Sequence, residues 1–274
     1  MAYCKTNNAE IYYEIIGEGS VPLFFLNGIL GNTKLVQKAG IPEILCERFT
    51  CVLHNYRGQD FTKFSGEFSF DDLIKDLWAL QEELGVSQIN LVGDAFGASL
   101  ALAYAHDYPK RVNRMVLSAG ASLKDINLAF KIASWVKALE KTDLETLYDI
   151  LFPDFFTREF VEKNLMELSG LKELLVGQKH KQSVLALLEA VLGRGVRRDY
   201  TALPHPALVI QGREDSIIKP YHGRNMASML PRAIYREADG AHVLLMENPN
   251  WYAAEIVNFL DGAEDWIKRS QRDD

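Results

Sequence analysis

One short segment, Gly93-Asp94-Ala95-Phe96-Gly97, has the spacing of a turn that presents a nucleophile. Glycines bracket the central residue of such a turn because that residue is held in a strained conformation, and larger neighbours would collide with the adjoining strand and helix. An apolar run precedes the segment and small residues follow it, which predicts a strand, a tight turn and a helix. The central residue is alanine, which has no nucleophilic atom.

The elements that would position this turn alternate between short apolar runs and longer segments of helical period. This alternation predicts a parallel sheet covered on both faces. Ser69 and Asp72 have the spacing of a capping box, which marks the start of a helix. The predicted strands are Ile11–Ile16, Leu23–Leu26, Cys51–His54, Ile89–Val92 and Val112–Leu117, and the predicted helices are Leu35–Phe49, Phe70–Leu84 and Phe96–Asp107.

Strand signals stop after about residue 122, and leucine and aromatic residues then recur at helical spacing as far as about residue 202. The alternation resumes after Pro204-His205-Pro206. Without a repeat or a linker, we expect one core, residues 1–122 and 203–274, that carries a helical cap, residues 123–202. The late elements predicted are strands Ala207–Ile210 and Ala233–Arg236 and helices Tyr221–Leu230 and Trp251–Phe259.

The chain resembles the α/β-hydrolase family over nearly its whole length. Leu26-Asn27-Gly28 stands where the family usually has His-Gly, and Tyr56-Arg57-Gly58 where it often has an Arg-Gly turn. Gly212-Arg213-Glu214-Asp215 and Gly240-Ala241-His242 follow the last two predicted strands, in the family's order of nucleophile, acid and histidine. The resemblance implies an α/β-hydrolase fold, with a mostly parallel twisted sheet, helices on both faces and an inserted helical cap.

The resemblance also implies a role for each matching residue. His242 would be the general base, because imidazole can take a hydroxyl proton and return it to a leaving group. Asp215 would hold the imidazole tautomer and stabilise the imidazolium. The backbone N–H groups of Ile29 and Phe96 would form the oxyanion hole, where one donor is worth roughly 2.7–4 kcal/mol. Since these donors are backbone groups, alanine at position 95 leaves them in place.

Neighbouring residues offer alternatives to this assignment. Glu214 adjoins Asp215 and could be the acid instead. Asp94 adjoins the apex of the turn without occupying it, so we do not expect a carboxylate nucleophile. Ser99 lies one helical turn past the apex and should face packing rather than substrate. The other histidines, His54, His106, His180, His205 and His222, are interpreted as structural.

Two explanations compete for Ala95. Either alanine replaces a native serine, which would trap a ligand or abolish turnover, or the protein lost its nucleophile naturally. The presence of both Asp215 and His242 favours a replaced serine, because a chain that had lost catalysis would have no chemical reason to keep them. A non-serine mechanism assisted by His242 is a third alternative.

The substrate is expected to be apolar and acylated or aromatic, because the cap is long and leucine-rich and no basic pocket is apparent. Asn27 and the cap aromatics Trp135 and Phe156 are expected to contact it, while most cap aromatics form the core of the cap. We expect a serine-type acyl hydrolase that cleaves a carboxylic ester or thioester through an acyl-enzyme and is inactive with Ala95.

Two other functions stay open. Asn27-Gly28 and Arg57-Gly58-Gln59 resemble the hydroxyacyl-carrier-protein acyltransferases, which favours acyl transfer from a carrier thioester. A catalytically dead protein of this fold that binds a small carbonyl ligand is the second alternative.

Composition argues against several other classes. The 274 residues are 48% hydrophobic and 24% charged, and 30 basic against 37 acidic residues leave a net charge of −7. Nucleic-acid binding relies on a basic surface, so no nucleic-acid partner is expected. The one basic cluster, Arg194, Arg197 and Arg198, is interpreted as a solvated helix end or turn.

The three cysteines form no CxxC pair, the N-terminus lacks a signal-peptide pattern, and no apolar run reaches the ~18 residues that span a bilayer. These features predict a cytoplasmic protein without a membrane span or a metal site. With no P-loop or dinucleotide fingerprint, no cofactor is expected.

Overall fold

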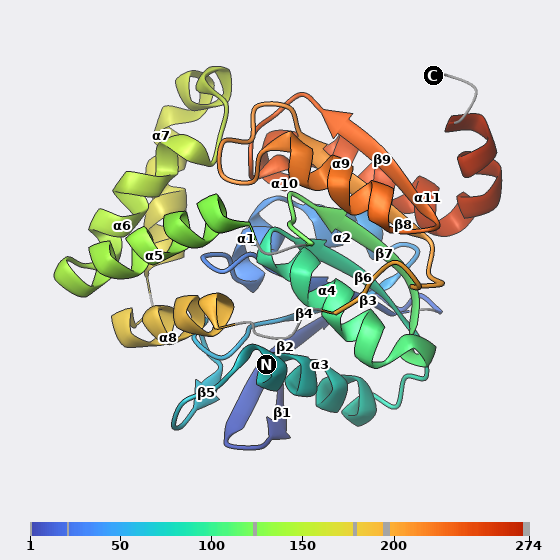
Figure 1. Cartoon of the computed structure of the whole chain (residues 1–274), viewed down its shortest axis with the longest axis horizontal. Coiled ribbons are helices and arrows are strands. Elements are labelled where there is room, and N and C mark those ends of the chain that lie inside the picture. Colours follow the sequence, from blue (N-terminus) through green and yellow to red (C-terminus); the bar gives the residue numbers. More distant parts are fainter. Residues whose placement is uncertain (1, 21, 123–124, 178–179, 194–197, 271–274) are drawn as a thin grey trace.

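A computed structural model describes residues 2–20, 22–122, 125–177, 180–193 and 198–270. The described residues form a nine-stranded sheet in the order β1-β2-β4-β3-β6-β7-β8-β9, with β5 paired to β2 (Figure 1). Pairings of β2 with β1, β4 and β5 are antiparallel, and the rest are parallel. The strands are β1 (Ala2–Thr6), β2 (Ala9–Ile16), β3 (Pro22–Leu26), β4 (Thr50–His54), β5 (Lys63–Phe64), β6 (Ile89–Asp94), β7 (Val112–Ser118), β8 (Ala207–Gly212) and β9 (Ala233–Ala238).

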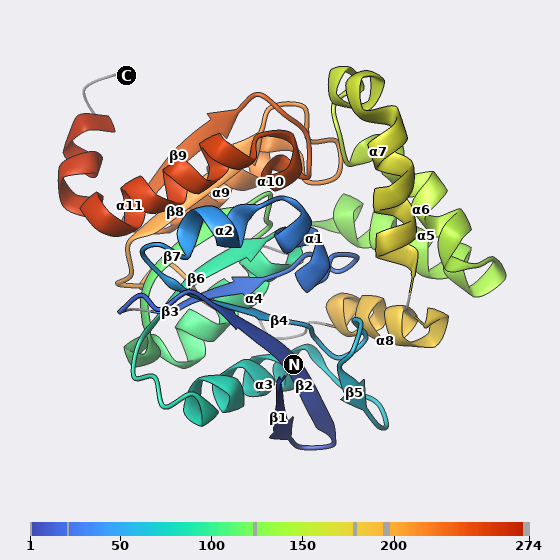
Figure 2. The same ribbon diagram turned by 180° about the vertical axis from the view of Figure 1, so that it is seen from behind.

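Helices cover both faces of this sheet. On one face lie α3 (Phe70–Glu83), α4 (Phe96–Asp107) and α9 (Pro220–Met229), and on the other lie α1 (Thr33–Lys38), α2 (Ile41–Leu45) and α11 (Pro249–Ser270), as Figures 1 and 2 show from opposite sides. The short helix α10 (Leu244–Glu247) precedes α11. Because helices cover both faces, the central strands are apolar and buried almost throughout, and the predicted α/β-hydrolase fold is confirmed.

Among the described residues, four α-helices between β7 and β8 form the helical insertion. They are α5 (Ile126–Lys141), α6 (Leu144–Leu151), α7 (Arg158–Val176) and α8 (Lys181–Leu192), gathered at one side of the molecule (Figure 1). Most leucine and aromatic side chains at helical spacing are buried here, as their periodicity predicted, but Phe130 and Leu165 are exposed. The predicted boundary at residue 123 lies outside the described residues, and the division into core and cap remains a proposal.

Most elements lie where the sequence predicted them, but the predicted helix Leu35–Phe49 is wrong. Gly40, in the left-handed region at φ 72°, separates α1 from α2, and Pro42 stands in the first turn of α2. The strands β1 and β5 were also not predicted. Both are short and lie at the edge of the sheet, where alternation with polar residues weakens the apolar signal.

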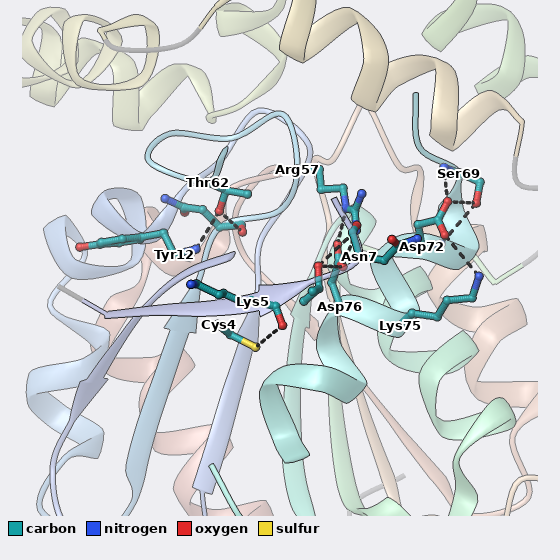
Figure 3. Close-up of polar contacts among 12 residues, drawn as sticks. Cys4, Lys5, Asn7, Tyr12, Arg57, Thr62, Ser69, Asp72, Lys75 and Asp76 are labelled. Atoms are coloured by element: carbon teal, nitrogen blue, oxygen red, sulfur yellow. Dashed lines mark hydrogen bonds and ion pairs between the residues drawn. The ribbon is translucent and has the colours of Figure 1, made fainter. Parts of the chain in front are cut away.

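The predicted capping box at the start of α3 is confirmed. The Asp72 N–H donates to Ser69 Oγ at 3.3 Å, and the Ser69 N–H donates to Asp72 Oδ2 at 2.9 Å (Figure 3). The two bonds satisfy backbone donors that the first turn leaves without intrahelical acceptors.

A buried ion pair between Arg57 and Asp76 fixes the turn after β4. Arg57 Nε and Nη2 donate to the two carboxylate oxygens of Asp76 at 2.7 and 2.8 Å, and Nη2 also donates to the Asn7 carbonyl at 2.7 Å (Figure 3). This two-point pairing ties the turn to α3 and to the β1–β2 hairpin. The following residue, Gly58, packs against α8, because a Cβ there would lie 2.5 Å from the Ser183 carbonyl oxygen.

Candidate active site

The segment around Ala95 forms a sharp turn between β6 and α4. Ala95 has φ 51° and ψ −109°, a strained conformation for a residue with a side chain, and it precedes the first residue of α4. A Cβ on Gly97 would overlap the Leu26 carbonyl oxygen, and one on Gly93 would lie 2.5 Å from the Gly97 carbonyl oxygen. The chain therefore forms a strained, closely packed turn between strand and helix, and position 95 at its apex carries no reacting group.

Asp215 and His242 form a buried pair next to this turn. His242 Nδ1 lies 2.9 Å from Asp215 Oδ2, and the two residues are only 8% and 3% exposed. A carboxylate accepts, so Nδ1 carries the proton and Nε2 is left as the basic nitrogen. Glu214, the alternative acid, is exposed, and it is Asp215 that His242 contacts.

The position of Asp215 is fixed by donors on both oxygens. The N–H groups of Ile217 and Ile218 donate to Oδ1 at 2.9 and 2.8 Å, while Gln211 Nε2 donates to Oδ2 at 3.0 Å. These donors hold the carboxylate in the orientation in which Oδ2 meets the His242 ring.

Burial and neighbouring charges act on the pKa of His242 in opposite directions. Burial lowers the pKa of His242, but the charge of Asp215 and its hydrogen bond outweigh that effect and leave the pKa above 6.5. Burial also raises the pKa of Asp94 to about 6, although the charge of His242 opposes the rise. Two carboxyl groups therefore act on one imidazole at this end of the sheet.

The loop after β3 contacts the turn at Ala95, and each of the two segments carries a backbone N–H group without an acceptor among the described residues. A Cβ on Gly28 would lie 3.4 Å from that of Ala95, and Gln59 Nε2 braces the loop by donating to the Gly28 carbonyl at 2.9 Å. The Ile29 N–H has no acceptor among the residues that the structure describes. The Phe96 N–H opens α4 and has no intrahelical acceptor. Both groups are available to bind an anionic oxygen.

A largely apolar cavity lies over these groups, between the sheet and the helical insertion. It comprises about 920 Å³ of space, its open mouth included. Its largely apolar lining suits a small apolar ligand. Its lining contains the predicted residues Ile29, Ala95, Phe96, Trp135, Phe156 and His242, together with Asp94, Ser99, Phe155, Leu175, Val191, Ile217 and Ile218 among others.

Two predictions about side-chain direction differ from the structure. Asn27 is absent from the cavity lining and instead donates from Nδ2 to the His54 carbonyl at 2.9 Å, while its own carbonyl accepts from Tyr56. Ser99 does line the cavity, but its hydroxyl donates to the Ala121 carbonyl at 2.7 Å. That bond occupies the hydroxyl proton, so Ser99 is poorly suited to replace the missing nucleophile.

Sequence reasoning also missed residues that support the loops and the imidazole of the site. Gln211 and Gln59 brace the loops of the site, and the Phe155 ring stacks on the His242 ring with centroids 6.4 Å apart. Gln211 did carry a signal, since it is an amide within the apolar run of β8.

The loop that carries Asp215 and the loop that carries His242 both contact the corner between α6 and α7, at Asp154 and Phe155. Ser216, next to Asp215, donates from Oγ to Asp154 Oδ1 at 2.8 Å. The Val243 N–H, next to His242, donates to the Phe155 carbonyl at 3.0 Å. The helical insertion is therefore bonded to both loops that carry the pair.

Other candidate sites are few. No group of three His, Cys, Asp or Glu side chains that could hold a metal is present in the described part of the chain. No described helix is long and apolar enough to cross a membrane. Arg198 pairs with Asp71 and Asp107 at 2.8 Å, and Arg194 and Arg197 of the predicted basic cluster lie outside the described residues.

Comparison with known proteins agrees with the geometry. The model of the alpha/beta hydrolase fold family matches residues 21–166, more than half of the chain, so the protein belongs to that family. It is 28% identical to a 2-hydroxymuconate semialdehyde hydrolase of Pseudomonas putida over 206 residues, 73% of this chain and 72% of that protein. It is 25% identical to the pyrrolizixenacetamide deacetylase of Xenorhabdus hominickii over 259 residues, 93% and 96% of the two chains. The crystal structure of the enol-lactonase from Burkholderia xenovorans LB400 shares the fold with a TM-score of 0.85 at 22% identity, covering 94% and 99%.

Proposed function

We propose that the cavity is the acyl-binding site of a serine-type hydrolase whose nucleophile position holds alanine in this chain. The observation that carries the proposal is the buried Asp215–His242 pair, 2.9 Å apart, beside the strained turn at Ala95. Two free backbone donors and an apolar cavity complete the arrangement. The relatives named above include a deacetylase and a semialdehyde hydrolase, and their activities support hydrolysis at a carbonyl carbon.

In the Ala95→Ser variant, each step uses a group already in place. The serine hydroxyl attacks the carbonyl carbon and gives its proton to His242 Nε2, while the N–H groups of Ile29 and Phe96 bind the oxyanion. His242 then protonates the leaving alcohol or thiol, and an acyl-enzyme remains. Water, deprotonated by the same nitrogen, then attacks the acyl carbon; the acyl–serine bond breaks, the acid leaves and His242 returns the proton to the serine oxygen.

The substrate we propose is a neutral carboxylic ester or thioester with an apolar acyl group. Trp135 and Phe156 contribute apolar surface to the cavity, which favours the acyl chain. Asp94 and Asp215 disfavour an anionic group close to the reacting carbonyl, because like charges repel strongly where water is excluded.

The test compares the chain as it stands with Ala95→Ser. The serine variant should react with a fluorophosphonate and hydrolyse esters and thioesters, and a double variant that also carries His242→Gln should do neither at a comparable rate. Failure of a folded Ala95→Ser to label would reject the acyl-enzyme mechanism. Adding an alcohol acceptor to the active variant separates hydrolysis from acyl transfer, since only a transferase forms a new ester in preference to the acid.

A second candidate function, a binding protein for a small carbonyl compound, is favoured by Ala95 itself. If this is the function, the chain with Ala95 binds apolar esters without hydrolysing them. A change in the fluorescence of Trp135, which lines the cavity, measures that binding. Strong binding by this chain, combined with an unreactive Ala95→Ser, would support the binding protein.

A further inference from the structure

Gln211, on β8, lies beside Asp215 and takes no part in the steps above. Its side chain is fully buried, and Nε2 donates to Asp215 Oδ2 at 3.0 Å and to the Ile218 carbonyl at 2.8 Å. Both neighbours can only accept in these contacts, so this end of the amide must be the NH₂ group.

The oxygen that Gln211 contacts is the one that holds the histidine. His242 Nδ1 lies 2.9 Å from the same Asp215 Oδ2, so two donors converge on one atom. The other oxygen is already occupied by two backbone N–H groups. Gln211 is thus the one side chain besides His242 that bonds to this carboxylate among the described residues.

A hydrogen bond from Gln211 to Asp215 Oδ2 partly neutralises the negative charge on that oxygen. Less of this charge is then left to stabilise the imidazolium of His242. We propose that Gln211 is a positioning residue that limits how strongly Asp215 holds protonated His242, because it shares Oδ2 with the imidazole. The catalytic consequence rests on the proposed function, but the effect on His242 does not. With Gln211 in place the imidazole gives up its proton more readily, which favours the free base at neutral pH.

Other groups act on the same ring and stay unchanged in the test. Asp94, at the end of β6, raises the pKa of His242, and Lys131, on α5, lowers it. The Gln211 amide packs against Gly223 of α9, where a side chain would crowd it: a Cβ there would lie 3.0 Å from the amide oxygen Oε1.

The test is a histidine NMR titration of the chain as it stands and of Gln211→Met, with the His242 signal assigned by its loss in His242→Gln. The pKa of His242 should rise by about 0.5 in Gln211→Met, roughly a threefold change in proton affinity. Gln81→Met is the matched control, because Gln81 is equally buried and also donates to backbone carbonyls. It should lower stability and leave His242 unchanged.

Should Gln211→Met fail to fold, Gln211→Leu provides the same test, because it also removes the donor from Asp215 Oδ2 and should also raise the pKa of His242. An unchanged or lowered pKa in a folded variant would overturn the proposal. In the Ala95→Ser background, Gln211→Met should also move the acid limb of kcat/KM to higher pH. A serine variant that does not label rejects the hydrolase, but leaves the titration result standing.

Discussion

The carboxylate of Glu247 binds the main chain and the side chain of Thr157 together. Oε1 accepts from the Thr157 N–H at 2.8 Å, and Oε2 accepts from the Thr157 hydroxyl at 3.2 Å. Oε1 also accepts from the Ala241 N–H at 3.3 Å, one residue before His242. A single side chain on α10 therefore connects the start of α7 with the histidine loop.

Glu247→Ala should destabilise the protein by about 1–3 kcal/mol, because it leaves backbone donors of Thr157 and Ala241 without acceptors. Thermal denaturation measures this change, with the exposed Glu214→Ala as the control. Binding of an apolar ester should weaken as well, since the wall of the cavity loses its attachment. Unchanged stability would mean that water replaces the carboxylate at no cost.

Asp94→Asn should stabilise the protein more at pH 8 than at pH 4. The folded pKa of Asp94 is raised from 3.8 to about 6, so the native state binds more protons than the unfolded state between these values. Stability therefore falls as pH rises through this window and stays reduced above it. The asparagine variant removes that loss.

Melting temperatures at the two pH values, measured beside the exposed control Asp239→Asn, check this sign. An equal effect of Asp94→Asn at both pH values would show that the carboxyl group is not held protonated by burial.

Gly58→Ala should loosen the packing of α8. Gly58 has φ 91°, and the new Cβ would lie 2.5 Å from the Ser183 carbonyl oxygen. Gly66→Ala is the matched control, because Gly66 has φ 75° with nothing within 4 Å of its Cβ position. Both variants carry backbone strain, so the difference between their denaturation midpoints reports the contact with α8. We expect Gly58→Ala to be the less stable by about 1–3 kcal/mol.

Phe156→Ala in the Ala95→Ser background should extend the range of acyl groups accepted. Removing a ring from the cavity wall should raise the ratio of kcat/KM for a long over a short acyl ester about tenfold. Phe160→Ala is the control, because its ring stacks on Phe156 at 5.1 Å and lies outside the cavity lining. Equal shifts in both variants would contradict a direct contact between Phe156 and the acyl group.

Residues fixed by their place in a strand or turn could be predicted from the sequence. The turn at Ala95, and the positions of Asp215 and His242 after the last parallel strands, follow from apolar runs and glycines. Side-chain direction within loops could not be predicted. Asn27 follows β3 as expected, yet its amide points to the His54 carbonyl, because a buried amide takes the nearest unpaired acceptor.

The role of Gln211 was missed for a related reason. An isolated amide in an apolar strand signals a buried hydrogen bond, but its partner comes from a loop whose path depends on the whole fold. The break between α1 and α2 was missed for a different reason. Gly40 and Pro42 indicate a helix end in the sequence, but the apolar residues around them recur at helical spacing, and this periodicity favoured one continuous helix.

The corner between α6 and α7 is hydrogen-bonded to the loop that carries Asp215 and to the loop that carries His242. Movement of the corner is therefore coupled to movement of these two loops. Any displacement of this corner that admits or releases a ligand must stretch the Asp154–Ser216 and Phe155–Val243 bonds. Asp215 and His242 are the immediate neighbours of those partners. If ligand exchange displaces this corner, it is therefore thermodynamically linked to the alignment of His242 with Asp215.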